Sequence, residues 1–182
     1  MRKLKYHEQK LLKKVDFINW EIDNNEQILK IMCRFNLRKR EEYIAYKQLV
    51  AEVRQLAEKL KELDTNDKFR NVNVIRLVEK LYLMGVIPTN RNFAEIDKLC
   101  VSSFCRRRLP VVMQKLNMSE TLQIATQRVE HGHVKVGTEL VTDPAFLVTR
   151  RSQDLITWTE NSKIKRHIAA YNEELDDFDL MD

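Results

Sequence analysis

The run HGH at residues 131–133 places two histidines close enough in the sequence to share a chemical role. His131 and His133 could form a metal clip, a catalytic pair, or part of a hinge where a helix ends and a sheet begins. A zinc site needs three or four ligands, and no cysteine or acidic pair lies close by in the sequence. We therefore expect no metal ion, and interpret His131 as a helix-end residue that faces exposed carbonyl groups.

The remaining reactive side chains do not form the pattern of an enzyme. Cys33, Cys100 and Cys105 contain no CxxC pair, which indicates reduced thiols instead of a disulfide framework or zinc site. The sequence has no GxSxG motif, no Walker loop and no HExxH motif, and no nucleophile has an evident base. We predict a protein with no catalytic residues, no cofactor and no small-molecule substrate.

Basic side chains are the groups whose distribution points to a partner. The 182 residues include 32 Lys and Arg against 27 Asp and Glu, for a net charge of +5. The last ten residues carry six acidic groups and no basic one, so +11 remains on residues 1–172. Such an excess makes nucleic acid the first partner class to test, although a solvated basic surface would have the same composition.

The first part of the chain must position these groups with helices, because the sequence has only 3 Gly and 3 Pro. Residues 2–20 form a basic amphipathic segment that could lie on RNA or on a protein. The run at 34–43 sets cations around Phe35, which could stack on a base or be buried. No apolar run approaches the roughly 20 residues that cross a bilayer, so we expect no membrane partner.

The clearest helical pattern covers residues 43–63, where apolar residues alternate in steps of three and four. This heptad spacing predicts a stripe that packs on another helix, either in this chain or in a protein partner. The candidate protein-binding residues of the stripe are Tyr46, Leu49, Val53, Leu56 and Leu60, and Leu63 continues it. A further helix is expected over 73–84, ending at Gly85, and a short one over 89–100.

The second part of the chain reads as two helices followed by a small sheet. The first helix begins near Arg106 with Pro110 in its first turn, and Ser119 is expected to cap the second, which ends at Gly132. After Gly132 the apolar period changes from 3.6 to 2, which predicts short strands at 133–136, 140–141, 146–148 and 155–158. We expect Phe146 and Trp158 to be core residues more than base-stacking ones.

Residues 106–158 resemble the S4-type RNA-binding domain. The motifs that carry the resemblance are Arg108-Leu109, HGHV at 131–134, KVG at 135–137 and PAF at 144–146. The resemblance implies an α+β fold: a mostly helical region at 1–105, an S4-type domain of two helices on a small, mainly antiparallel sheet at 106–170, and an acidic tail at 171–182. Many S4 domains carry arginines near the start of the second helix, where this chain has Glu120, Ala125 and Thr126.

Candidate RNA-binding residues are the basic groups in or beside this domain. Three arginines at the start of a helix gain nothing from its dipole, which favours phosphate binding for them. For the others, RNA contact and ordinary surface charge stay equally open until the resemblance is considered. The set is Arg106, Arg107, Arg108, Lys115, Arg128, His131, His133, Lys135, Arg150, Arg151, Lys163, Lys165 and Arg166.

The flanks of the chain and the phrase VTDPAFLVTR are similar to a narrower family, the S4-domain proteins of the U3 small nucleolar ribonucleoprotein, which are relatives of the eukaryotic ribosomal S4 protein. This similarity spans essentially the whole chain. It implies a nuclear, nucleolar role in the small-subunit processome, with the U3 small nucleolar RNA, precursor ribosomal RNA and a large acidic phosphoprotein among the partners. A protein adaptor that uses the N-terminal helices and a structural ribosomal S4-type protein are the alternatives.

Overall fold

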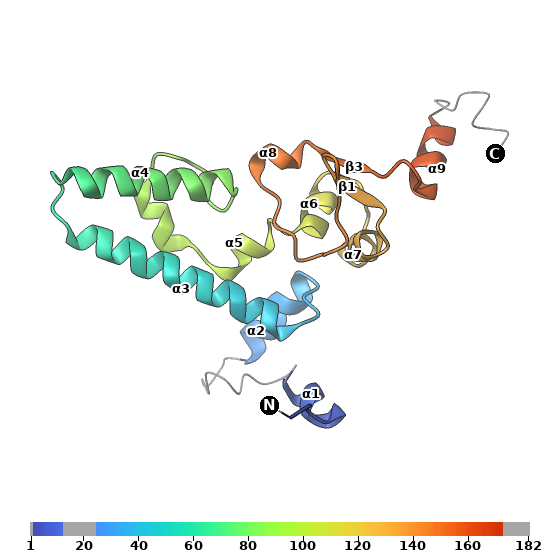
Figure 1. The fold of residues 1–182 in the computed structure, drawn as a ribbon, viewed down its shortest axis with the longest axis horizontal. Coiled ribbons are helices and arrows are strands. Elements are labelled where there is room, and N and C mark those ends of the chain that lie inside the picture. Colours follow the sequence, from blue (N-terminus) through green and yellow to red (C-terminus); the bar gives the residue numbers. More distant parts are fainter. Residues whose placement is uncertain (1, 13–24, 173–182) are drawn as a thin grey trace. The chain divides into compact units, whose positions relative to one another are not determined.

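A computed structural model describes residues 2–12 and 25–172 of the chain (Figure 1). The chain divides into two compact units, residues 1–107 and 108–182. In the described ranges the first unit is helical, and the second combines helices with a three-stranded antiparallel sheet. The predicted α+β class is therefore confirmed. The acidic residues 173–182 lie outside the described residues.

In its described ranges the first unit is a series of helices. They are α1 (Tyr6–Leu12), α2 (Asn25–Arg34), α3 (Arg40–Glu62), α4 (Lys68–Leu83), the 3-10 helix η1 (Phe93–Lys98) and α5 (Val101–Cys105). The amphipathic segment expected at 2–20 is helical at α1, and Leu4 just before this helix and Leu11 within it are exposed. Its residues 13–20 lie outside the described part. Phe35 is buried, so its place beside Arg34 reflects packing and not an exposed stacking platform.

Helices α3 and α4 pack as an antiparallel pair with η1 against them, as Figure 1 shows. Their shared core consists of Ala57, Val78, Leu81, Ile87, Ile96 and Leu99. The prediction that α4 begins at residue 73 was wrong, because the Asp67 carboxylate caps it by accepting a 2.9 Å hydrogen bond from the Phe69 amide. Its end is confirmed: Gly85 has φ +74, a conformation that favours glycine.

The second unit contains α6 (Leu109–Lys115), α7 (Leu122–Glu130), β1 (Val134–Val136), β2 (Glu139–Leu140), α8 (Arg150–Gln153), β3 (Ile156–Trp158) and α9 (Lys163–Tyr171). Its core joins α6 and α7 to the sheet through Leu109, Val112, Met113, Ala125, Val129, Val134, Val141, Val148 and Ile156. Burying a side chain of this kind contributes roughly 1.5–3 kcal/mol relative to leaving it exposed. This core packs α6 and α7 on the sheet, and so positions Arg128 on α7 and Lys135 on β1.

The sheet has the order β2-β1-β3, with Val134 opposite Trp158 and Val136 opposite Ile156. The strand expected at 146–148 was wrong. Leu147 forms only an isolated bridge with Arg108, and the Leu109 amide donates to the Phe146 carbonyl at 2.9 Å. This segment therefore pairs with the chain that enters α6 and does not extend the sheet.

Helix α7 begins at Leu122, and its cap differs from the expected one. The Thr121 hydroxyl accepts a hydrogen bond from the Ile124 amide at 3.3 Å, whereas Ser119 is buried. At the other end the helix stops as predicted, because His131 is its last cap residue and Gly132 has φ +73. None of the helices in the described ranges is long and apolar enough to cross a membrane.

Candidate RNA-binding surface

The three consecutive arginines do not form one exposed cluster. Arg106 is exposed, whereas Arg107 and Arg108 are only 9% and 3% exposed. In the first unit, the Arg107 guanidinium lies so close to Gly85 that a Cβ atom there would approach its Nε to 2.7 Å. Arg107 and Arg108, which we predicted to bind phosphate, are too deeply buried to reach RNA in this structure. Arg106 is exposed and stays a predicted phosphate-binding residue.

Arg128 on α7 is held in place by two contacts. Its guanidinium donates to the Met118 carbonyl at 2.7 Å, and its central carbon lies 5.4 Å from the centre of the Trp158 ring. A guanidinium over an indole face is an attractive cation–π arrangement, and the carbonyl contact fixes the plane of the group. Arg128 is therefore an oriented cation that ties α7 to β3.

Lys135 on β1 is the second cation with a defined partner. Its amine donates to the Glu160 carboxylate at 2.8 Å, and the lysine side chain is 27% exposed while that of Glu160 is 74% exposed. This hydrogen bond, followed by the charges of Lys135 and Lys165, lowers the pKa of the Glu160 carboxyl. Glu160 therefore keeps its negative charge at neutral pH beside two candidate phosphate-binding lysines.

The cations of α9 are in a different situation, because no residue of this helix is buried. Lys163, Lys165 and Arg166 are all exposed. The start of the helix is capped by Ser162, whose hydroxyl accepts from the Ile164 amide and also bonds the His133 Nδ1 at 3.1 Å. The exposed cations are thus attached to the sheet through the first residues of α9.

The remaining predicted cations lie on α6 and α8. Lys115, in the last turn of α6, and Arg151 on α8 are exposed, and Arg150 is half-buried. RNA contact at each of these positions stays a prediction. They show that positive charge is present on several elements of the second unit besides α9.

The two histidines lie at the end of α7, as expected for a hinge. Their rings are 6.2 Å apart in an edge-on arrangement, with His131 exposed and His133 half-buried against Ser162. Among the described residues, no three His, Cys, Asp or Glu side chains converge as a metal site. The His133 carbonyl accepts a hydrogen bond from the Thr159 amide at 3.0 Å, so this residue links α7 to the end of β3.

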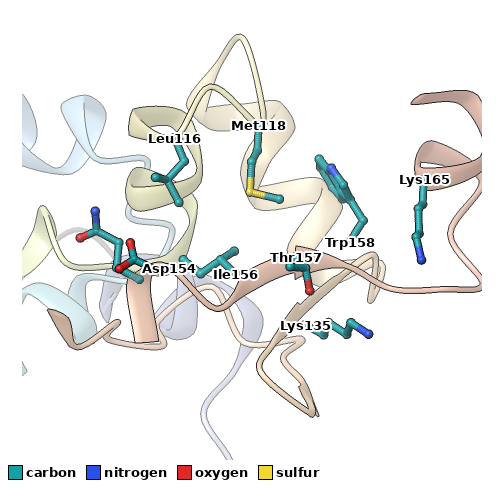
Figure 2. Close-up of a pocket in the computed structure, with 9 residues that line it drawn as sticks. Leu116, Met118, Lys135, Asp154, Ile156, Thr157, Trp158 and Lys165 are labelled. Carbon is teal, nitrogen blue, oxygen red and sulfur yellow. The ribbon is translucent and has the colours of Figure 1, made fainter. Parts of the chain in front are cut away.

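A groove of about 690 Å³ runs beside β3 (Figure 2). Its lining comprises Leu116, Met118, Lys135, Gln153, Asp154, Ile156, Thr157, Trp158 and Lys165. Only Lys135 and Lys165 in this set were predicted site residues. The others could not be grouped from the sequence, because they come from the α6–α7 turn, α8 and β3. The one signal for them was Trp158, an aromatic residue in a strand near basic residues.

The heptad-like stripe on α3 divides between two faces. Tyr46 and Leu60 are buried, and Val53 packs against the α3–α4 core, whereas Leu49 and Leu56 are 40% and 46% exposed. Ala57 has no exposed surface and takes a core position next to Leu56. The candidate protein-binding surface on α3 therefore reduces to Leu49 and Leu56.

Comparison with known proteins identifies the family of the chain. The Ribosomal protein S4/S9 N-terminal domain family matches residues 3–123, and the S4 domain family matches residues 107–154. The chain is 54% identical to the U3 small nucleolar ribonucleoprotein protein IMP3 of Mus musculus over 181 residues, which are 99% of this chain and 98% of that protein. The chain belongs to the IMP3 family of S4-domain proteins.

Another IMP3 relative, from Saccharomyces cerevisiae, is 46% identical over 99% of both chains. The small ribosomal subunit protein uS4 of Thermoplasma acidophilum is 26% identical over 86% of this chain and 79% of that protein. The predicted resemblance to the U3-associated S4 proteins and to the ribosomal S4 family is therefore confirmed. The IMP3 family is closer to this chain than the ribosomal uS4 proteins compared with it.

Proposed function

We propose that this chain is a non-catalytic RNA-binding assembly factor of the U3 small nucleolar ribonucleoprotein, acting in the nucleus and nucleolus. It binds the U3 small nucleolar RNA and promotes its pairing with precursor ribosomal RNA, for early cleavages in maturation of the 18S RNA and the small subunit. The observation that carries the proposal is an S4 domain at residues 107–154 followed by α9, which exposes three cations, in a chain of the IMP3 family.

The position of the cations supports RNA binding away from the start of α7. Glu120 is exposed immediately before that helix, and its carboxylate repels phosphate groups. Lys163, Lys165 and Arg166 are exposed instead on α9, beyond the sheet. We therefore expect RNA phosphates to bind on the sheet and α9 side of the second unit.

Such a surface can promote RNA pairing without any chemical step. Two RNA strands repel each other through their phosphates, and cations that neutralise part of that charge lower the repulsion. Since counterions are released when cations bind phosphates, both RNA affinity and the rate of pairing are expected to fall as salt increases. No group in this account acts as an acid, base or nucleophile.

The proposal is tested by measuring how fast a U3 RNA strand pairs with its complementary precursor strand, with and without the purified full-length chain. We expect acceleration that declines with salt and that is lost in K163A/K165A/R166A. A matched control, K59A/K68A/R76A, removes three exposed cations from the first unit and should keep the acceleration. If the wild-type chain neither binds these RNAs nor accelerates pairing, the proposal is wrong.

The exposure of Leu49 and Leu56 favours a second function, docking of another protein of the same particle, for which a large acidic phosphoprotein is the proposed partner. We expect L49E/L56E to keep the circular dichroism spectrum and RNA affinity of the wild type and to lose binding to that protein. The control Y46A removes a buried side chain and should instead lower the unfolding temperature. If L49E/L56E retained full partner binding, this surface would have no docking role.

A further inference from the structure

The groove beside β3 has an apolar middle and two polar ends. Figure 2 shows Trp158 and Met118 along it, with Lys165 near one end and Asp154 at the other. Ligand sites in proteins typically have volumes of about 300–1,000 Å³ with a few polar groups at defined places, and the groove's 690 Å³ falls in that range. The pattern fits a ligand that is flat and apolar on its faces, polar at its edges, and negatively charged at one end.

Trp158 is the element that favours a flat aromatic ligand. The side chain packs partly on the core and partly lines the groove, and it is not sealed into the core in the way that Val134 and Val129 are. Arg128 lies over the ring and is itself held by the Met118 carbonyl, so the orientation of the indole is set before any ligand arrives. A preorganised aromatic surface binds a nucleobase with little loss of side-chain entropy.

The edge of β3 provides hydrogen-bonding groups along the same groove. In the described sheet β3 is an edge strand, because the order is β2-β1-β3. The Leu155 carbonyl accepts from the Gly137 amide and the Thr159 amide donates to the His133 carbonyl, so these alternate residues bond toward β1. The alternation of an antiparallel ladder then directs the backbone groups of Ile156 and Trp158 to the open edge, where a base edge can meet them.

The basic end of the groove suits the phosphate of a nucleotide whose base lies against Trp158. Lys165 is exposed and Lys135 lies opposite Thr157 across the β1–β3 pair. The Glu160 carboxylate competes for both lysines, which keeps this end selective for a ligand that brings its own negative charge. Asp154 at the far end would repel a second phosphate, so the charges also set a direction for the bound strand.

We propose that this groove is a subsite for an unpaired nucleotide of RNA, with the nucleobase against Trp158 and Met118 and its phosphate at Lys135 and Lys165. The inference rests on the proposed RNA-binding function and specifies which form of RNA this site takes. A paired base has both faces covered by stacking and its edge occupied, so duplex RNA can reach the α9 cations but cannot fill the groove.

The test follows the fluorescence of Trp158 in the full-length variant W20F, which leaves Trp158 as the single tryptophan of the chain. A short oligoadenylate is titrated in parallel with a perfectly paired RNA duplex of similar charge. We expect the single strand to quench Trp158 fluorescence and the duplex to bind without quenching it. W158L in the wild-type background is expected to lower oligoadenylate affinity roughly tenfold, the value of one base–aromatic stack.

A second variant keeps the test decisive if W158L does not fold. T157Y places a bulky ring at the phosphate end of the groove, because Thr157 lies on the same face of the sheet as Lys135. The control T142Y makes the same change at an exposed position outside the groove lining. We expect T157Y to abolish quenching and T142Y to preserve it. If duplex and structured RNA bind with strong salt dependence while oligoadenylate does not quench Trp158, or while T157Y leaves the quenching unchanged, the subsite is refuted and the RNA-binding function stands. If no RNA binds at all, both fail.

Discussion

The sheet and helix α9 present positive charge in two different ways. On the sheet side, Arg128 and Lys135 each have a defined protein partner, the Met118 carbonyl with the Trp158 ring and the Glu160 carboxylate respectively. On α9, Lys163, Lys165 and Arg166 extend from a helix that buries none of its residues. The same residue types are therefore oriented in one region and exposed to water in the other.

This difference predicts different contributions to RNA binding. An oriented cation has already lost its side-chain freedom, so it can fix the position of a ligand, but part of its charge is offset by its partner. An exposed cation keeps more of its charge, although Glu160 acts on Lys165, and it loses up to about 2 kcal/mol of side-chain entropy when it becomes ordered. We therefore expect α9 to supply most of the RNA affinity, and Arg128 and Lys135 on the sheet side to fix the position of the bound RNA.

The largest effect is expected from removing the α9 cations. K163A/K165A/R166A should weaken binding to U3 RNA roughly hundredfold at low salt and reduce the log–log salt slope by about 2 to 3, since each phosphate contact contributes 0.7–0.9. Fluorescence anisotropy over a salt series measures both values. A fall in affinity by the same factor at every salt concentration would contradict a role of these cations in phosphate binding, because the loss of phosphate contacts must change the log–log slope.

An intermediate effect is expected at Arg128. R128A loses the bond to Met118 and the contact with Trp158, so we expect about a tenfold loss of RNA affinity and a lower unfolding temperature. R128K keeps the charge and loses the planar group, and should recover little of either loss. Full recovery by lysine would show that Arg128 acts only as a positive charge, and would remove the distinction between the two regions.

The smallest effect is expected at Glu160, and it is a gain. E160Q preserves the shape of the side chain and releases Lys135, so RNA affinity at neutral pH should rise about two- to fivefold, in line with the modest strength of an exposed ion pair. The control E139Q removes an exposed carboxylate from β2 and should change affinity less. A loss of affinity in E160Q would contradict the competition between Glu160 and phosphate.

The pH dependence of this effect has a defined sign. Lys135 lowers the pKa of the Glu160 carboxyl, so the ion pair stabilises the fold above the ordinary carboxyl pKa and is lost as the pH falls through the lowered value. The wild type and E160Q are therefore expected to differ in RNA affinity at neutral pH and to converge in acid. Anisotropy measured on both variants across that range checks the convergence.

The hinge and the helix pair could be predicted from sequence because local rules decide them. Gly132 must adopt positive φ where α7 ends, and the change from a 3.6 to a 2 period marks the start of β1. The segment 146–148 has the same alternation, yet it pairs with the entry to α6. Pairing between distant segments depends on the assembled fold, which the pattern of one segment does not contain.

The candidate site was harder to predict because burial of charged residues depends on distant neighbours. Arginine is rarely buried, so nothing in the sequence distinguishes Arg107 from Arg106, although Gly85 leaves room for the Arg107 side chain. On α3, the small Ala57 carries a weaker apolar signal than Leu56 but permits closer packing, which shifted the core face by one residue. Trp158 could be predicted as a core residue with base stacking as the alternative, whereas its place in the groove depends on the packing of β3 beside the α6–α7 turn.

The central claim is that RNA binds the sheet and α9 side of the second unit, and residue-level crosslinking tests it most directly. The purified full-length chain would be crosslinked to U3 RNA by ultraviolet light, and the modified peptides assigned by mass spectrometry. We predict crosslinks to peptides that contain Trp158 and the α9 cations, in the wild type and in K59A/K68A/R76A. Crosslinks confined to the first unit, with none on β3 or α9, would contradict the account.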